Sequence, residues 1–247
     1  MTLNVPIAID AIAAPLTCAS CSARSKSICR VLSADDLHQL NAIARHRRFE
    51  AGQTVVTEGD TAVLGVVVEG MLIERRTLSD GRDQIISLRF PADLVGGSAP
   101  AEMADANLEA ATPTVLCSFD KAGFEQALNS LPHLQSALVD QMRRELTQAR
   151  DWMLLLGQKN AREKVATFLL RLADRSRNRH CGTASDLVDG DLFEIPLGRA
   201  QIAAFLGLTI ETVSRKFTEF QKQRMIELNG TRSVRVNDVA ALRAAAG

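Results

Sequence analysis

The sequence predicts an α+β protein with three successive parts: an antiparallel β unit, a long helix and a C-terminal helix-turn-helix. Residues 49–119 hold short runs rich in Val and Ile that glycines and turn residues interrupt, which is typical of an antiparallel sandwich or barrel. In residues 122–157, apolar side chains recur every three or four positions, which predicts one long helix. Residues 197–236 carry two short helical patterns around a glycine, followed by a turn dipeptide.

Length and composition describe an ordinary globular protein. The chain has 247 residues, of which 46% are hydrophobic and 23% charged, enough for two domains with real cores. No apolar run approaches the roughly 18 to 20 residues that span a bilayer. The apolar run near the N-terminus lacks a preceding Lys or Arg and is interrupted by Asp10, so it is not a secretory signal. We therefore expect a cytoplasmic protein, in which clustered cysteines are metal ligands or redox thiols more often than disulfides.

The β unit begins after a short helix. Residues 33–44 open with a serine N-cap and acidic residues in the first turn, which predicts that helix. In the run QIISLRF, we expect Ile86, Leu88 and Phe90 to share one buried face because they alternate with polar residues. The Asp-Gly dipeptide at 80–81 suits the tight hairpin turn before this strand.

The end of the long helix is unusually apolar. Its run WMLLL covers more than one face, so a partner helix from a second subunit is expected to bury it. Leu138, Met142, Ala149, Met153 and Leu156 are the apolar positions expected at that interface. A further helix is predicted over residues 161–174, and then a loop in which Cys181 is an incidental thiol.

The strongest local pattern is the helix-turn-helix. The positions that define it are Ile202, Ala203 and Leu206 in the first helix, Gly207 at the turn, Thr209 as the next cap, and Val213, Phe217 and Phe220 in the second helix. Asn229-Gly230 then predicts a hairpin, the wing of a winged helix. A helical hairpin of an unrelated all-α domain is the alternative, but helix, turn, helix and wing agree with one another.

The second helix has an exposed side suited to reading DNA. Glu211, Ser214 and Arg215 share one face near its N-terminus. A carboxylate can accept from cytosine and a guanidinium can bind guanine. We expect Lys216, Arg199 and Arg232 to contact phosphates, and Thr212 is a further candidate DNA contact. Although the chain has no net charge, residues 199–247 carry eight basic and four acidic residues, a net charge of +4, which favours a nucleic-acid partner.

Together, the glycine-interrupted β unit, the long helix and the ETVSR helix resemble the CRP/FNR superfamily of bacterial transcription regulators. The segments LEAATPTVLCSFDKAGFE and DWMLLLGQKNAREKVATFLLRL are similar to the FNR branch. The resemblance implies a jelly-roll β-roll of the cyclic-nucleotide-binding type. It divides the chain into a cysteine-rich segment (1–32), a β-roll sensor (33–128), a dimerisation helix (129–157) and a winged helix-turn-helix (158–247). No cyclic nucleotide is expected, because the Gly-Glu and Arg-Ser phosphate-binding pattern has no counterpart.

The resemblance also assigns the cysteines. It implies an oxygen-labile [4Fe-4S] cluster held by Cys18, Cys21, Cys29 and Cys117, since such a cluster requires four thiolates. Arg24 and Lys26 lie in the cysteine loop, where positive charge favours thiolates. A zinc site on the same four cysteines is the main alternative, although zinc usually takes two closely spaced cysteine pairs.

The function implied is that of an oxygen-sensing transcription regulator. An intact cluster would promote a homodimer that binds inverted repeats resembling TTGAT and ATCAA, with RNA polymerase as a further partner. Asp151 matches an acidic position that lies at the dimer seam in the family. The alternative is a family member that responds to a small molecule, or to thiol or zinc redox chemistry.

An enzyme is the reading from another class, but we do not expect one. It would use Cys18 or Cys117 as nucleophile and one of the four histidines, His38, His46, His133 or His180, as base. No residue pattern links any histidine to a cysteine.

Overall fold

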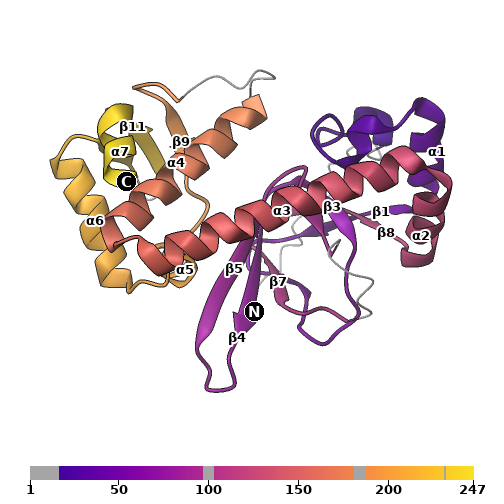
Figure 1. Ribbon diagram of the computed structural model, residues 1–247, viewed down its shortest axis with the longest axis horizontal. Helices are drawn as coiled ribbons and strands as arrows, with labels where there is room; N and C mark the ends of the chain where they lie inside the picture. Colours follow the sequence, from indigo (N-terminus) through magenta and orange to yellow (C-terminus); the bar gives the residue numbers. More distant parts are fainter. Residues whose placement is uncertain (1–16, 97–102, 181–186, 231) are drawn as a thin grey trace, which may run out of the picture.

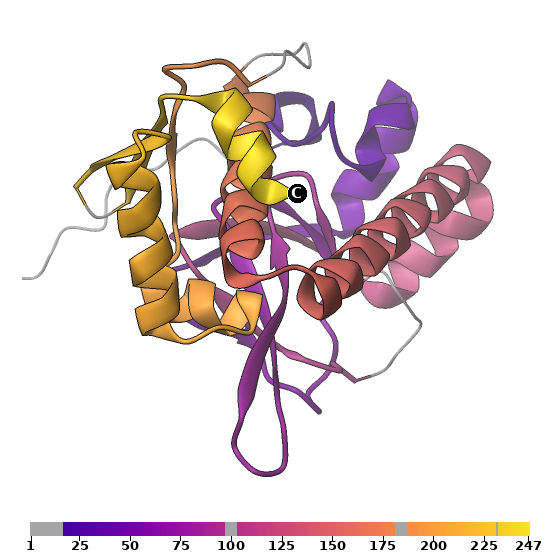
Figure 2. The same ribbon diagram turned by 60° about the vertical axis from the view of Figure 1, so that its left-hand side comes forward.

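The long helix α3 (Pro132–Gln158) runs between a β-roll and a smaller helical part of the molecule (Figure 1). This computed structural model describes residues 17–96, 103–180, 187–230 and 232–247. A view turned by 60° shows the helical part stacked against the hairpin of the roll (Figure 2). Within the described residues, no helix is long and apolar enough to cross a membrane.

The N-terminal segment is short and helical. It consists of the 3-10 helices η1 (Cys18–Ser20) and η2 (Ile28–Val31), followed by α1 (Ala34–Ile43). Ser33 and Asp36 form a capping box, in which each side chain accepts a hydrogen bond from the other residue's backbone N–H. This reciprocal cap satisfies two N–H groups at the helix start, and it confirms the short helix that the sequence predicted.

The roll consists of two four-stranded antiparallel sheets, ordered β1-β8-β3-β6 and β2-β7-β4-β5. Their strands are β1 (Ala44–Phe49), β2 (Thr54–Val56), β3 (Gly65–Glu69), β4 (Leu72–Thr77), β5 (Asp83–Arg89), β6 (Leu94–Val95), β7 (Asn107–Ala110) and β8 (Thr114–Phe119). Val67, Leu72, Leu108 and Leu116 pack between the sheets. The predicted antiparallel sandwich is therefore confirmed.

The predicted alternation in β5 is wrong at Ile86. That side chain is 41% exposed, whereas its neighbour Ile85 is fully buried. The register explains the difference: Glu74 pairs with Ser87 and Arg75 pairs with Ile85, so Ile86 is the extra residue of a β-bulge. A bulge reverses which residues face the core on one side of it. The hairpin itself is present, and Gly81 in its turn adopts a φ of +85°.

The predicted single helix over residues 122–157 is two helices. α2 (Lys121–Ser130) ends before Leu131, and α3 begins at Pro132. Proline lacks the N–H that would continue the first helix and its ring favours the first turn of the next. α3 continues through Gly157 and ends at Gln158.

The C-terminal part begins with α4 (Ala161–His180), which extends into the stretch predicted as a loop. The remaining elements are β9 (Leu192–Glu194), α5 (Arg199–Leu206), α6 (Ile210–Lys222), β10 (Ile226–Asn229), β11 (Ser233–Val236) and α7 (Val239–Ala246). β9 adds a third strand to the wing hairpin, in the order β10-β11-β9. Cys181 lies outside the described residues.

The predicted helix-turn-helix is confirmed in detail. Gly207 caps α5 in the left-handed conformation, with φ 61° and ψ 43°, which glycine adopts without a steric penalty. The Thr209 side chain then accepts from the Thr212 N–H and starts α6. Val213, Phe217 and Phe220 are all buried.

One hydrophobic core joins the two parts of the molecule. It contains Ile73, Ile85 and Phe90 of the roll together with residues of α3, α4 and the helix-turn-helix. The roll and the helical part therefore meet through packed apolar side chains. The position of α5 and α6 depends on the β4–β5 hairpin.

Candidate metal centre and nucleic-acid interface

Four cysteines from two distant segments line one small pocket. Cys18 and Cys29 lie in η1 and η2, Cys21 follows η1, and Cys117 lies on β8. All four are free thiols. The pocket leaves only about 20 Å³ for water-sized molecules. The structure thus brings together all the cysteines that the resemblance predicted as ligands.

Packing on both sides fixes the position of Cys117. β8 lies between β1 and β3, where His46 and Val66 are the direct cross-strand neighbours of Cys117. Both neighbours also line the pocket. Because β8 is hydrogen-bonded on both edges, the Cys117 thiol lies on the most rigid wall of this pocket.

The other three thiols depend on the N-terminal segment. Ala23 and Ile28 are buried in the same hydrophobic cluster as Cys117, so the segment is held down by apolar contact. The Ser27 side chain accepts a hydrogen bond from the Cys29 N–H at 3.2 Å. This hydroxyl caps η2 and thereby orients the backbone that carries Cys29.

Burial disfavours ionisation of three of these thiols, Cys117, Cys29 and Cys18. It raises the pKa of Cys117 to about 12 and that of Cys29 to about 11, with repulsion from neighbouring thiolates as a further cause for both. Burial also raises the pKa of Cys18, while Arg24 acts in the opposite direction. Binding of a metal group would therefore have to displace protons. Arg24 lines the pocket, whereas Lys26 is exposed.

The donor set fits an iron–sulfur cluster. Four cysteine sulfurs and no carboxylate line the pocket, and four thiolates are the ligands that a [4Fe-4S] cluster takes. Among the described residues, no group of three or more His, Cys, Asp and Glu is arranged to hold a metal ion. The match to a cluster is thus one of donor type and of a shared pocket.

The outward side of α6 forms the candidate nucleic-acid surface. Glu211, Ser214 and Arg215 are exposed there, as predicted. A backbone hydrogen bond lowers the pKa of Glu211, and the Thr209 hydroxyl and Arg215 lower it further. Sequence reasoning missed Thr218 and Lys222, which continue the same face and line an open groove with Ser214 and Arg215. Thr218 follows Ser214 by four residues, a spacing that places both on one helix face and could have identified Thr218.

Four predicted DNA contacts are engaged within the protein. The Lys216 ammonium lies 2.8 Å from a Glu219 carboxylate oxygen, and Arg162 binds the same carboxylate. The Arg199 guanidinium lies 3.6 Å from the centre of the Phe217 ring, and burial lowers its pKa. The Thr212 hydroxyl accepts from Arg215 at 3.2 Å. Arg232 is exposed near the wing.

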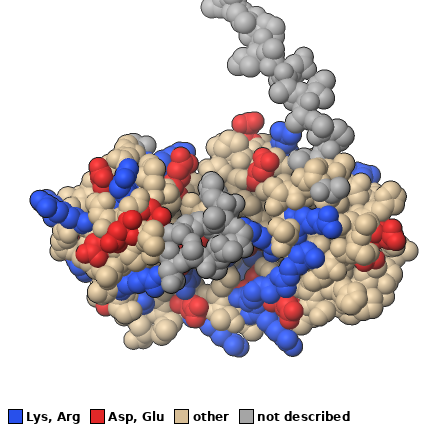
Figure 3. All heavy atoms as spheres, turned by 90° about the horizontal axis from the view of Figure 1, so that it is seen from above, with Lys and Arg blue, Asp and Glu red and all other residues tan. Residues whose placement is uncertain are grey.

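Both signs of charge lie along this face of α6, where Arg215 and Lys222 line the groove together with Glu219. In the half drawn on the left of Figure 3, acidic and basic side chains are interspersed. The assignment of α6 therefore depends on its geometry within the helix-turn-helix.

An exposed apolar stripe runs along α3. Its members recur every three or four residues and are Val139, Met142, Leu146, Ala149 and Met153. Met153 is the most exposed, at 70%. Of the other predicted interface residues, Leu138 and Leu156 are partly buried against the chain's own cores. The stripe has the spacing of a helix–helix seam.

The seam position expected for Asp151 stays a prediction. Residues two apart on an α-helix point roughly 200° away from each other, so Asp151 faces away from Ala149 and Met153. Its carboxylate lies 3.8 Å from the Arg171 guanidinium on α4 of the same chain. Asp151 therefore lies beside the helical part of its own chain and not on the apolar stripe.

Comparison with known proteins agrees with this architecture. Residues 163–245 match the Crp-like helix-turn-helix domain family, and residues 46–130 match the cyclic nucleotide-binding domain family. The second match concerns the roll, and the expectation that no cyclic nucleotide binds stays a prediction.

Curated relatives and a solved structure resemble the chain along most of its length. The transcriptional activator protein FnrL of Cereibacter sphaeroides is 36% identical over 231 residues, covering 93% of this chain and 92% of FnrL. The nitrogen fixation regulation protein FixK of Bradyrhizobium diazoefficiens is 36% identical over 212 residues, covering 85% and 86%. The structure of FixK2 from Bradyrhizobium japonicum superimposes with a TM-score of 0.73 at 28% identity, covering 83% of this chain and 98% of FixK2. The chain belongs to the CRP/FNR family of DNA-binding transcription regulators, with transcriptional activators of the FNR and FixK type among its relatives.

Proposed function

We propose that this protein is an oxygen-sensing transcription regulator that holds a [4Fe-4S] cluster on Cys18, Cys21, Cys29 and Cys117. The observation that carries the proposal is the convergence of these four thiols, three from the N-terminal segment and one from β8, on one pocket. The N-terminal segment and β8 would share one set of ligands. Loss of the shared group would then release the segment from the roll.

When bound, such a cluster supplies an oxygen-labile link between the segment and the roll. The chain's own residues translate that link into DNA binding. Cys117 and the buried cluster around Ala23 and Ile28 lie beside α3, against which η2 packs. The apolar stripe of α3 would then meet its copy in a homodimer, and two α6 helices would face successive major grooves.

The target would be an inverted repeat resembling TTGAT and ATCAA, read by the exposed side of α6. RNA polymerase is the expected further partner of a transcriptional activator. We place this action in the cytoplasm, and we assign the protein a binding role rather than a catalytic one.

The raised thiol pKa values bear on the alternatives. A redox sensor that works through reactive thiols needs exposed cysteines with a lowered pKa, whereas burial raises the pKa of Cys29 and Cys117. The burial of these thiols therefore favours a metal group over a thiol switch. Zinc is the alternative metal, for which all four sulfurs would lie at about 2.3 Å from one point.

Anaerobic purification tests the proposal. We expect a brown protein with about four iron and four sulfide ions per chain. Its DNA binding should disappear together with the colour on exposure to air. A colourless protein that contains zinc would contradict the cluster. A protein that contains neither iron nor zinc and binds DNA only with an added small molecule would instead support a regulator that responds to that molecule.

A further inference from the structure

Strand pairing connects the thiol pocket to the turn before β6. Val66 on β3 pairs with Cys117 on one side and with Leu94 of β6 on the other. All three residues belong to one buried cluster. Any displacement of Cys117 is thus passed across β3 to Leu94, because buried side chains in a packed sheet cannot move independently.

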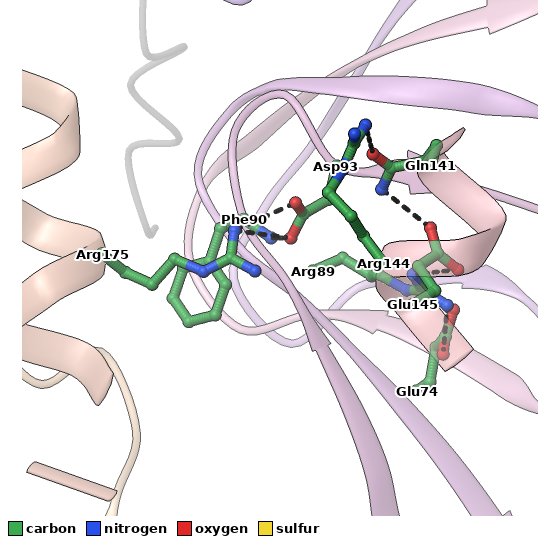
Figure 4. Close-up of polar contacts among 8 residues, drawn as sticks. All are labelled: Glu74, Arg89, Phe90, Asp93, Gln141, Arg144, Glu145 and Arg175. Carbon is green, nitrogen blue, oxygen red and sulfur yellow. Dashed lines mark hydrogen bonds and ion pairs between the residues drawn. The ribbon is translucent and has the colours of Figure 1, made fainter. Parts of the chain in front are cut away.

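Asp93 immediately precedes Leu94 and contacts the helical part of the molecule. One of its carboxylate oxygens accepts from the Phe90 N–H at 2.9 Å, and the other lies 3.0 Å from the Arg175 guanidinium on α4 (Figure 4). The Arg175 guanidinium also lies 5.2 Å from the centre of the Phe90 ring. Only 15% of the Asp93 side chain is exposed, so this pair is less screened by solvent than a surface ion pair.

The turn that carries Asp93 is held in an unusual conformation. Ala92 adopts a φ of +77°, which residues with a side chain rarely do. The Ala92 N–H donates to the Val67 carbonyl at 2.8 Å, and the Val67 N–H donates to the Asp93 carbonyl at 3.0 Å. A strained turn persists only where its surroundings fix it, so β3 determines where the Asp93 carboxylate lies.

A second charged contact holds the preceding strand to α3. Arg89 at the end of β5 binds Glu74 at 2.8 Å and Glu145 of α3 at 3.0 Å (Figure 4). Its side chain is only 16% exposed. The segment between Arg89 and Asp93 is therefore held to the dimerisation helix at one end and to α4 at the other.

We propose that Asp93 is a positioning residue that transmits the state of the thiol pocket to the DNA-binding part through Arg175. The inference rests on the proposed function and adds a route within one chain to the route through dimerisation. α4 shares its hydrophobic core with α5 and α6, so a shift of Arg175 moves the recognition helix with it.

The fluorescence of a tryptophan can report on the contact between the roll and the DNA-binding part. Trp152, the one tryptophan of the chain, stacks on Phe205 of α5 with ring centres 4.0 Å apart. Gln84 of the roll donates to the Phe205 carbonyl at 3.3 Å. Acrylamide quenching of Trp152 fluorescence therefore reports how closely the two parts are joined, whether or not iron is bound.

The test uses Arg175→Gln in the full chain, which removes the charge and leaves the turn around Asp93 unchanged. Arg175→Lys is the conservative variant, and Arg76→Gln is the matched control because Arg76 pairs with Glu58 within the roll. DNA affinity is measured with and without iron, at concentrations where sedimentation shows both forms to be dimers. We expect Arg175→Gln to reduce the ratio of the two affinities by about 5-fold or more. The difference in Trp152 quenching between the two forms should disappear, while iron content stays that of the wild type.

Arg175→Lys should restore most of the ratio, and Arg76→Gln should keep all of it. A wild-type ratio in Arg175→Gln overturns the role of Asp93 and Arg175. The proposed function fails separately, if the wild-type protein binds no iron or binds DNA equally well in both forms.

Discussion

Gly65 lies directly against the backbone of Cys117: a Cβ atom added to Gly65 would meet the Cys117 carbonyl oxygen at 2.6 Å. Two neighbouring strands can approach this closely only because residue 65 has no side chain. The position of one candidate ligand thus depends on a glycine on another strand.

Gly65→Ala should therefore destabilise the roll and displace Cys117. We expect a loss of about 1 to 3 kcal/mol, as for other overpacked sites, measured by denaturant unfolding, together with reduced iron content. Gly157→Ala is the control, because no atom lies within 4 Å of an added Cβ there and alanine favours a helix. If Gly65→Ala unfolds at the wild-type denaturant concentration, the close approach does not constrain this strand.

Replacement of single cysteines tests the ligand set. Cys117→Ser and Cys29→Ser should each abolish iron binding after anaerobic purification, because a cluster that loses one thiolate of four becomes labile. Cys181→Ser should keep the wild-type iron content. Iron loss in the Cys181 variant, or retention in the Cys117 variant, would reassign the fourth ligand.

Substitutions on α6 separate base contacts from phosphate contacts. Arg215→Ala should weaken binding to the preferred inverted repeat by roughly 1 to 3 kcal/mol per half-site and scarcely affect random DNA. Lys222→Ala should weaken both to a similar extent and reduce the salt slope by about one. Titrations at several salt concentrations measure both effects. Equal losses on both DNAs for Arg215→Ala would make Arg215 a phosphate contact.

The stripe on α3 predicts which substitutions affect dimer formation. Ala149→Asp places a carboxylate in the middle of the stripe and should weaken the dimer by about 3 kcal/mol, the cost of an uncompensated buried charge. Asp151→Ala tests the expected seam position: it removes a charge that would be desolvated on pairing, so the cluster-free variant should shift toward the dimer. Analytical ultracentrifugation measures Ala149→Asp under anaerobic conditions and Asp151→Ala in air. No increase in dimer for Asp151→Ala would remove that residue from the seam.

Local signals were sufficient to predict the helix-turn-helix. Gly207, Thr209 and the Asn229-Gly230 dipeptide each act on backbone close to them in the chain, so the sequence alone specifies the turn and the wing. Pro132 marks the break between α2 and α3 in the sequence. Apolar residues recur at helical spacing on both sides of it, so that spacing alone predicts one helix. The bulge at Ile86 could not be predicted, because it depends on how β5 pairs with β4.

Contacts between distant segments were beyond prediction from the residues themselves. The spacing of Cys18, Cys21 and Cys29 suggests a metal site, yet only the family resemblance added Cys117. Pairing of β1, β8 and β3 brings that residue to the pocket. The ion pair between Asp93 and Arg175 likewise has no sequence signature, since neither residue lies in a motif and their distance depends on how α4 packs against the roll.

The core that joins the roll to the helical part also limits how the chain can be divided. Phe90 and Ile85 pack in the same cluster as Leu169, Phe205 and Phe217. A DNA-binding fragment that begins after α3 would expose one side of this cluster to water, and exposed apolar surface promotes aggregation. The regulator is therefore best regarded as a single folding unit, in which the roll forms part of the scaffold of the DNA-binding part.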